Sequence, residues 1–243
     1  NPNLGVSVSV DYMLEEIAIA EGSLSKKAEF MCKYCNIKQN SSLAWLPAQA
    51  IEAISGEAID IEALRGSYCV CGLDLSQTTD LTAAIALIEK DGRLNVFAHF
   101  WMPSQRIDEA TERDAVPYWT YVKRGLLSLS GDNFVDYHDC FRWFTDLISR
   151  YELYPLKIGY DRYSSQYLVK DLEAAGFQCD DVFQGDNLWP VLQEMEGLIK
   201  DKTIYIGDND LLKSHLLNSE IKMSAERGRG RLIKINPTSH IDG

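Results

Sequence analysis

Three aspartates each have a glycine within two residues and lie where a structural element is expected to end or begin. Asp74 and Asp161 follow short apolar runs typical of strands, and Asp242 directly precedes Gly243. A buried carboxylate costs free energy unless it is paired or binds a metal. Carboxylates that converge from separate elements at one sheet edge offer the oxygen ligands that Mg²⁺ prefers. The pattern therefore predicts two-metal phosphodiester chemistry, which is the chemistry of a nuclease.

Each aspartate also has a simpler structural explanation. Asp74 and Asp80 can flank a turn in which Asp and Thr side chains bond to the backbone, although a turn needs no carboxylate inside the strand. Asp161 can cap the helix that follows, but Ser164 lies closer to the helical run. Asp242 can favour the dipole of a helix beginning there, by about 0.3–1 kcal/mol. The three aspartates are metal-ligand candidates because they occur together.

From residue 67 onward, the pattern is that of an α/β sheet. Apolar runs predict consecutive strands at 68–75, 81–88 and 94–100, with a hairpin turn at 90–93. Helices and strands then alternate, with helices expected at 117–124, 136–151, 164–176 and from an Asn187 cap, and strands at 156–161, 178–183, 204–206, 221–224 and 232–235.

An antiparallel three-strand meander followed by parallel βα units makes a mixed sheet flanked by helices. In such sheets the active site lies beyond the carboxyl ends of the strands. This rule places Asp74 and Asp161 together if their strands are neighbours.

The chain is expected to divide near residue 66. Residues 1–66 are predicted to form a helical arm or linker, with helices ending at Gly22, capped by Ser23 and opening at Pro47, and residues 67–243 to form the sheet domain. No Gly-x-x-x-x-Gly-Lys-Ser/Thr phosphate loop occurs in the sequence.

Charge argues in two directions about a nucleic-acid partner. The net charge of −12 and the pI near 4.8 argue against one for the chain as a whole. Bound cations would cancel part of that charge, and local charge matters more than the total. The one dense basic run is interleaved with glycine and consists of Arg227, Arg229, Arg231 and Lys234. It is predicted to form a hairpin tip that holds the DNA backbone, and the alternative is a solvated loop.

Membrane and secretory signals are not found in the sequence. No apolar stretch approaches the roughly 18 residues needed to span a membrane, and the first residues lack a basic start followed by an apolar run. Asn1 in place of Met, together with the end at Gly243, suggests a fragment of a longer chain.

Cysteine and histidine give weaker signals. Cys32 and Cys35 have the spacing of zinc ligands, but one such pair is a weak signal, and free thiols are expected for all six cysteines. His99 and His138 are expected to be structural, whereas His240 lies two residues before Asp242 and can contact phosphate.

Several motifs together resemble the nuclease domain of phage terminase large subunits. The segment Gly72-Leu-Asp-Leu-Ser-Gln-Thr-Thr-Asp-Leu-Thr-Ala83 resembles the first strand of that domain. The other matching motifs follow in order: Val116-Pro-Tyr-Trp119, Gly125-Leu-Leu127, Val135-Asp-Tyr137, Ile158-Gly-Tyr-Asp-Arg162, Phe183-Gln-Gly185 and His240-Ile-Asp-Gly243. Phe30, Asn36 and Trp45 resemble the linker to the packaging ATPase, and the ATPase itself is missing.

The resemblance implies a ribonuclease H-like fold and metal-dependent cutting of double-stranded, concatemeric phage DNA in the cytoplasm of the bacterial host. Carried over by position, Asp74, Asp161 and Asp242 hold two divalent cations, Mg²⁺ or Mn²⁺, and Asp80 completes the shell. The implied partners are DNA, the portal and the small terminase subunit, and no membrane is involved.

Two other functions fit parts of the sequence. The Gly72, Asp74 and Thr78 pattern also resembles the phosphate loop of the actin and sugar-kinase ATPases, although those loops usually have glycine where Ser76 stands. A non-catalytic module that docks on packaging partners would use the acidic surface and exposed aromatic residues such as Trp119.

Overall fold

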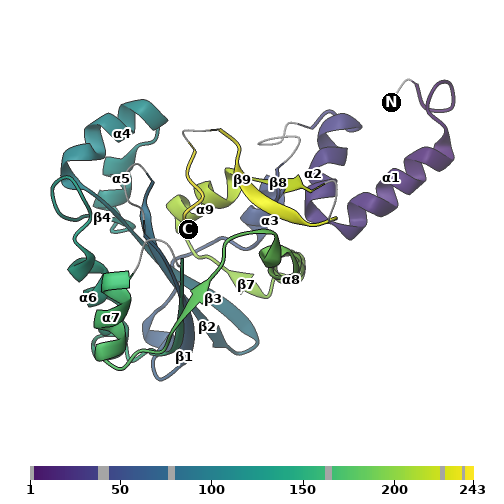
Figure 1. The fold of residues 1–243 in the computed structure, drawn as a ribbon. Helices are drawn as coiled ribbons and strands as arrows, with labels where there is room; N and C mark the ends of the chain where they lie inside the picture. Colours follow the sequence, from purple (N-terminus) through teal and green to yellow (C-terminus); the bar gives the residue numbers. More distant parts are fainter. Residues whose placement is uncertain (1–2, 38–43, 76–79, 162–165, 225–227, 237–238) are drawn as a thin grey trace. The chain divides into compact units, whose positions relative to one another are not determined.

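The computed structural model describes residues 3–37, 44–75, 80–161, 166–224, 228–236 and 239–243 (Figure 1). Its contacts define two compact units, each discontinuous in sequence. We call them the sheet unit (Ser55–Gln184, Thr203–Lys213 and Asp242–Gly243) and the hairpin unit (Asn1–Ile54, Gly185–Lys202 and Ser214–Ile241). A domain boundary near residue 66 stays a prediction, since compactness alone does not define a folding domain.

A mixed sheet forms the centre of the sheet unit. Within the described residues it has seven strands in the order β4-β3-β2-β1-β5-β6, and β7 also pairs with β3. The strands are β1 (Tyr68–Asp74), β2 (Thr82–Lys90), β3 (Arg93–Met102), β4 (Leu127–Leu129), β5 (Tyr154–Asp161), β6 (Cys179–Val182) and β7 (Ile204–Tyr205). Pairing is antiparallel between β1, β2 and β3 and parallel elsewhere. The predicted mixed α/β architecture is therefore confirmed.

The predicted hairpin between β2 and β3 is present. Lys90 pairs with Arg93, and the two residues between them, Asp91 and Gly92, have φ angles of 52° and 75°. Two consecutive positive φ angles match the right-handed twist of the strands. Asp and Gly tolerate this backbone, so the turn fixes the register of the meander.

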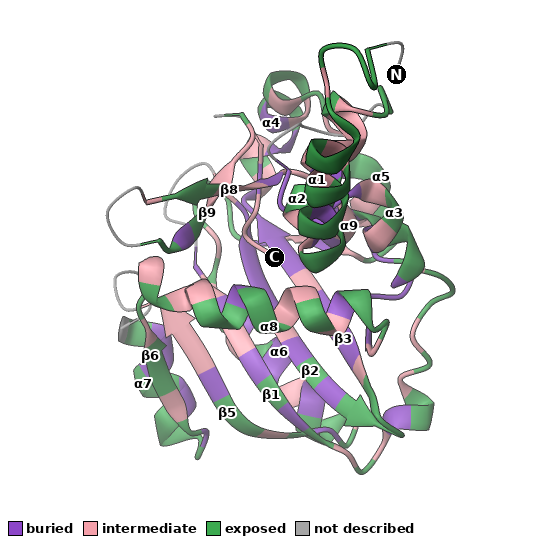
Figure 2. Cartoon of the chain, turned by 90° about the vertical axis from the view of Figure 1, so that its right-hand side faces the viewer, coloured by how far each residue is buried: buried purple, intermediate pink, exposed green. Residues whose placement is uncertain are grey.

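One face of the sheet packs against helices α6 (Tyr137–Ser149) and α7 (Gln166–Ala174). Residues alternate along β1, so Cys71 and Leu73 are buried in this core while Val70 is exposed (Figure 2). The apolar stripe of α6 recurs at helical spacing and consists of Cys140, Trp143, Phe144 and Leu147.

Shorter helices complete the sheet unit. They are η1 (Glu62–Leu64), η2 (Ser104–Arg106), α4 (Ile107–Asp114) and α5 (Tyr118–Lys123). Helix α9 (Asp210–Leu217) begins in the sheet unit and ends in the hairpin unit.

The hairpin unit joins helices to a separate two-stranded sheet. Its elements are α1 (Val10–Gly22), α2 (Leu24–Lys33), α3 (Ala48–Ala53), η3 (Asp186–Leu188), α8 (Trp189–Lys200), β8 (Ser219–Met223) and β9 (Gly230–Lys234). Trp45 is buried, and its indole Nε1 donates a hydrogen bond of 2.8 Å to Glu196 on α8. A Cβ atom at Gly230 would lie 2.6 Å from the Trp189 ring, so only glycine fits at this contact.

The structure adds two elements that the sequence did not predict and corrects one expectation. Strand β4 was not predicted because it has only three residues. Helix α9 was also missed, although the Asn209 side chain accepts a hydrogen bond from the Leu212 amide, which is the local signal of a helix start. Asn187 is not the cap of α8, because a 3₁₀ turn at Asp186–Leu188 precedes that helix.

We predict that Gly131→Ala destabilises the fold more than Gly125→Ala. Both glycines have positive φ angles, 62° and 73°, but a Cβ at Gly131 would lie 2.1 Å from the Phe134 carbonyl oxygen, whereas one at Gly125 meets nothing within 4 Å. The φ strain costs about 1–2 kcal/mol at either site, and overlap adds about 1–3 kcal/mol at Gly131. Urea unfolding measures the difference, and equal free energies of unfolding would contradict it.

Candidate metal centre

Asp74 and Asp161 end two neighbouring parallel strands. The preceding residues, Leu73 of β1 and Tyr160 of β5, are paired in register. Leu73 points into the core beneath α6 and α7. Because side chains alternate along a strand, Asp74 and Asp161 lie on the opposite face of the sheet. The two aspartates thus meet at one sheet edge, and their role as metal ligands stays a prediction.

Asp80 and Asp242 lie at the same edge. Asp80 comes just before β2, which runs antiparallel to β1 and therefore starts where β1 ends. Asp242 accepts a hydrogen bond of 3.2 Å from the backbone amide of Leu81. A carboxylate oxygen of Asp80 and one of Asp242 lie within 4.8 Å of each other. We call Asp74, Asp80, Asp161 and Asp242 the carboxylate cluster.

The contacts of Asp242 show what orients its side chain. Its carboxylate contacts the backbone that leads into β2, through the bond from Leu81. The side chain is therefore held by the strand edge.

Burial and the neighbouring carboxylates make ionisation of Asp74 unfavourable. Burial, and then the negative charges of Asp242, Asp161 and Asp80 in that order, raise the pKa of its carboxyl to about 7, while a hydrogen bond with Gln184 acts in the opposite direction. Three neighbouring carboxylates therefore lie close enough to affect its ionisation. Gln184, which follows β6, was not predicted as a site residue, although it belongs to the Phe183-Gln-Gly185 motif.

The donor set of the cluster fits hard divalent cations. All four residues supply carboxylate oxygens and are half-buried. Mg²⁺ and Mn²⁺ accept such oxygen ligands, whereas zinc sites are usually built from thiolates and imidazoles. A cation would also remove the repulsion that raises the Asp74 pKa. Among the described residues, no group of three close metal-ligand atoms includes Cys32 or Cys35.

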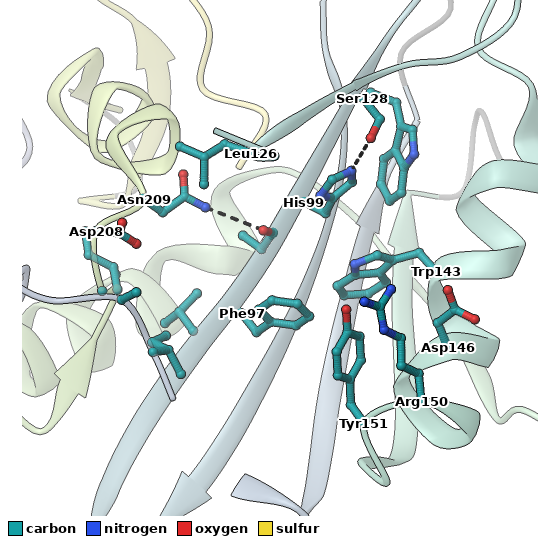
Figure 3. Close-up of a pocket in the computed structure, with 18 of the residues that line it drawn as sticks. Phe97, His99, Leu126, Ser128, Trp143, Asp146, Arg150, Tyr151, Asp208 and Asn209 are labelled. Carbon is teal, nitrogen blue, oxygen red and sulfur yellow. Dashed lines mark hydrogen bonds between the residues drawn. The ribbon is translucent and has the colours of Figure 1, made fainter. Parts of the chain in front are cut away.

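A separate hollow of about 580 Å³ lies on the other face of the sheet, lined by residues such as Phe97, Trp143 and Arg150 (Figure 3). Its wall includes His99, which shares a 2.8 Å hydrogen bond with Ser128. Burial lowers the pKa of His99 to about 4, so the imidazole is neutral near pH 7. A structural His99 is consistent with its expected role.

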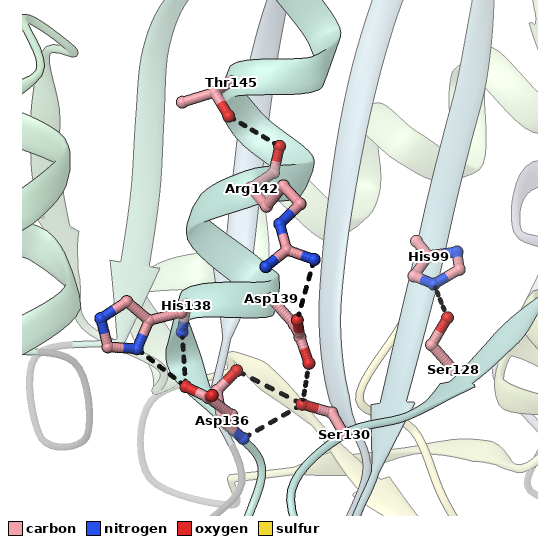
Figure 4. Close-up of polar contacts among 8 residues, drawn as sticks. All are labelled: His99, Ser128, Ser130, Asp136, His138, Asp139, Arg142 and Thr145. Atoms are coloured by element: carbon pink, nitrogen blue, oxygen red, sulfur yellow. Dashed lines mark hydrogen bonds and ion pairs between the residues drawn. The ribbon is translucent and has the colours of Figure 1, made fainter.

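Asp139 in the wall of this hollow, and Asp136 near it in the chain, already have partners. Asp139 forms an ion pair with Arg142 at 3.6 Å and accepts a hydrogen bond of 2.6 Å from Ser130 (Figure 4). Asp136 accepts from the His138 amide at the start of α6, as predicted for a helix cap. These contacts give Asp136 and Asp139 structural roles.

The predicted DNA-contacting residues belong to the hairpin unit. Arg229 and Arg231 are exposed and Lys234 is half-buried, whereas Arg227 lies outside the described residues. His240 is buried, and its ring stacks on that of His215 at 6.2 Å between centroids. The loop with Ser76 and Thr78, on which the kinase alternative depends, also lies outside the described residues. All these assignments stay predictions.

Comparison with known proteins identifies close relationships. A family model described as terminase large subunit, endonuclease domain, matches residues 1–243. The terminase large subunit of Enterobacteria phage HK97 is 30% identical over 248 residues, which cover 100% of this chain and 48% of that protein. The chain thus spans about half the length of this curated relative.

Solved structures show the same fold. The crystal structure of the HK97 large terminase matches with a TM-score of 0.70 and 26% identity, over 100% of this chain and 50% of that one. The large terminase nuclease of thermophilic phage G20c matches with a TM-score of 0.52 and 12% identity, over 79% of this chain and 90% of that one. Its magnesium-bound structure gives a TM-score of 0.50 at 11% identity. The expected ribonuclease H-like fold is confirmed.

We predict that Asp74→Asn raises the melting temperature of the metal-free protein at pH 8. The folded-state pKa of Asp74 is raised from its ordinary 3.8 to about 7, so ionisation of Asp74 reduces stability as pH rises through this range. Each kcal/mol of relieved repulsion corresponds to roughly 2–4 °C. Calorimetry in EDTA measures the gain, which shrinks toward pH 5 because Asp74 is then largely protonated in the folded protein.

Asp91→Asn provides the matched control. Asp91 is exposed in the β2–β3 turn, where Asn tolerates the positive φ angle. Its melting temperature should follow the wild type at every pH. If the difference in melting temperature between Asp74→Asn and the wild type were equally independent of pH, the cluster would not perturb the ionisation of Asp74.

Proposed function

Because the chain belongs to the family of terminase large subunit endonuclease domains, we propose that it is a metal-dependent endonuclease that cuts double-stranded, concatemeric phage DNA during genome packaging. The observation that carries this proposal is the convergence of Asp74, Asp80, Asp161 and Asp242 at one sheet edge. Two-metal cleavage of a phosphodiester bond needs such an anionic, oxygen-rich site for divalent cations.

In this proposal, Asp74, Asp161 and Asp242 hold two cations, Mg²⁺ or Mn²⁺, and Asp80 completes the ligand shell. The bound cations would supply Lewis-acid chemistry, lowering the pKa of the attacking water and offsetting negative charge on the scissile phosphate. The strand ends hold the carboxylates at fixed positions, which limits reorganisation during the reaction. Asp242 is oriented by the Leu81 amide, and Gln184 orients Asp74.

The magnesium-bound G20c nuclease is consistent with this choice of cation. No serine, cysteine or histidine nucleophile is needed, because water attacks the phosphate directly. His99, with its pKa lowered to about 4 and its place on the opposite sheet face, is not suited to proton transfer here. In this proposal the carboxylates act by holding the cations, and the cations and water carry out the chemistry.

The wider setting follows from the family. The partners are double-stranded DNA and, in the complete motor, the portal and the small terminase subunit, with activity in the cytoplasm of the bacterial host. Within the described residues, no helix is long and apolar enough to cross a membrane. Cutting would produce a DNA end during packaging.

We predict that the protein nicks or linearises supercoiled plasmid with Mg²⁺ or Mn²⁺ and stops with EDTA. Asp74→Asn and Asp161→Asn should each reduce cutting at least about 100-fold, since each removes a ligand charge, while Asp91→Asn should cut like the wild type. Gel electrophoresis follows the products, and thermal melting confirms folding.

The outcomes separate the alternatives. Full activity in Asp74→Asn or Asp161→Asn would exclude the carboxylate cluster as the active site. ATP-dependent phosphoryl transfer without cutting would favour the kinase-like function. Absence of both activities would favour a non-catalytic packaging module.

We also predict that Arg229 and Arg231 contact the DNA backbone. Both are exposed; Arg229 directly precedes β9, and Arg231 lies within it. Each lost phosphate contact should reduce the slope of log affinity against log salt by about 0.9. Replacing both by Gln should therefore weaken DNA binding and flatten the salt dependence, measured by fluorescence anisotropy.

Lys222→Gln is a suitable control for this pair. Lys222 lies on β8, opposite Arg231, and it is exposed in the same hairpin. It tests whether any lost positive charge in the hairpin has the same effect. If the double Arg variant keeps the wild-type slope, the basic segment is only a solvated loop.

A further inference from the structure

A second hollow, of about 470 Å³, adjoins the carboxylate cluster. One of its walls is Asp80, and the others come from the end of β3, from η2 and α4, and from the segment before α6. Two arginines, Arg106 and Arg113, line it. Positively charged side chains beside a proposed nuclease centre are suited to contact DNA phosphate. It therefore matters whether each arginine already has a carboxylate partner.

Arg113 is engaged within the protein. It donates two hydrogen bonds, of 2.6 and 2.8 Å, to the carboxylate of Asp114, whose side chain is fully buried. The same carboxylate accepts a bond of 3.0 Å from the Tyr118 hydroxyl. Arg113 therefore balances a buried charge and is not available to a ligand.

Arg106 is in a different state. In the part of the chain that the structure describes, no carboxylate forms an ion pair with its guanidinium, which lies 5.9 Å from the centre of the Phe134 ring. The residue is half-buried. A partly desolvated guanidinium without a carboxylate partner retains its capacity to bind an anion.

The backbone around Arg106 is fixed in place. The amide and the hydroxyl of Ser104 donate to the Gly131 carbonyl at 3.1 and 2.7 Å, and the Gln105 amide donates to the Asp132 carbonyl at 3.1 Å. These bonds join η2 to the tight turn at Gly131, which also carries Phe134. Arg106 is thus presented by a rigid corner of the sheet unit.

The acidic lining determines what this hollow can bind. Asp80 and Glu109 lie in its wall, so a free anion gains little there. Divalent cations on the carboxylate cluster would cancel the charge of Asp80. Anion binding should then require both the cations and Arg106, a combination that suits a phosphate of a DNA strand entering the metal centre.

We propose that Arg106 binds a backbone phosphate of the DNA beside the carboxylate cluster, at a site separate from the basic segment around Arg229. This inference rests on the proposed nuclease function and adds a binding residue to it. The guanidinium would donate bidentate hydrogen bonds to the phosphate oxygens, with the Phe134 ring beside it.

The test is DNA binding by Arg106→Gln, measured by anisotropy of a short fluorescent duplex with Ca²⁺ in place of Mg²⁺ over a salt series. We expect about tenfold weaker binding and a loss of about 0.9 from the salt slope. Arg106→Lys should keep the slope and lose part of the affinity, because it retains the charge without the planar fork. In cutting assays, Arg106→Gln should raise KM and retain kcat.

Arg142→Gln is the matched control, since Arg142 is an exposed arginine on α6, paired with Asp139, and should leave the slope unchanged. A wild-type slope in folded Arg106→Gln, or a reduced slope in Arg106→Lys, would overturn the proposal. If the wild type cuts DNA while Arg106→Gln behaves normally, only this inference fails. If the wild type neither binds nor cuts DNA with metal, the nuclease function itself fails.

Discussion

Repulsion among four carboxylates at one sheet edge is the constraint that the rest of the sheet unit must satisfy. Burial and three neighbouring charges raise the Asp74 pKa to about 7, so ionising it without a cation opposes folding. The opposite face of the same strands supplies the compensation, because Leu73 and Ile158 are buried there beneath α6 and α7. Packing between β5 and β6 is close here: a Cβ at Gly159 would lie 3.1 Å from Cγ2 of Val182, so the Val182 side chain would have to shift by a few tenths of an ångström. The hydrophobic core thus holds in place a carboxylate cluster whose mutual repulsion the proposed cations would offset.

Much of this arrangement could be predicted from the sequence, for physical reasons that differ between elements. Strands β1, β2 and β3 come from long apolar runs, and Asp91-Gly92 specifies the turn between β2 and β3, so local preference and tertiary fold agree. Asp74 and Asp161 were recognisable because a carboxylate at the end of an apolar strand has few structural uses. The adjacency of β1 and β5 was not predictable, since the sequence alone does not say which strands pair. For the same reason the contacts of Gln184 and the Leu81 amide appear only in the folded chain, and β4 is too short to carry a pattern.

Net charge is a poor guide to the surface of this protein, because many of its arginines are already engaged. Arg113 balances buried Asp114, and Arg124 pairs with both Asp208 and Asp210. Counting such residues as basic overstates the positive charge offered to DNA, and counting the cluster as acidic ignores the cations that it would bind. For a polyanionic substrate, the relevant residues are the basic side chains that lack a carboxylate partner, together with their positions. In the described part of the sheet unit, Arg106 meets that condition beside the carboxylate cluster.

The hydrogen bond from Leu81 to Asp242 also determines when the cluster can form during synthesis. The two residues are 161 positions apart, and a ribosome adds about 5–20 residues per second. Strand β3 ends at Met102, about 140 positions before Asp242, so synthesis of the β1–β2–β3 meander is complete roughly 7–28 s before Asp242 is added. During that interval the nascent chain has Asp74 and Asp80 but lacks Asp242, and at first it also lacks Asp161. The complete carboxylate cluster thus forms only after translation has passed residue 242.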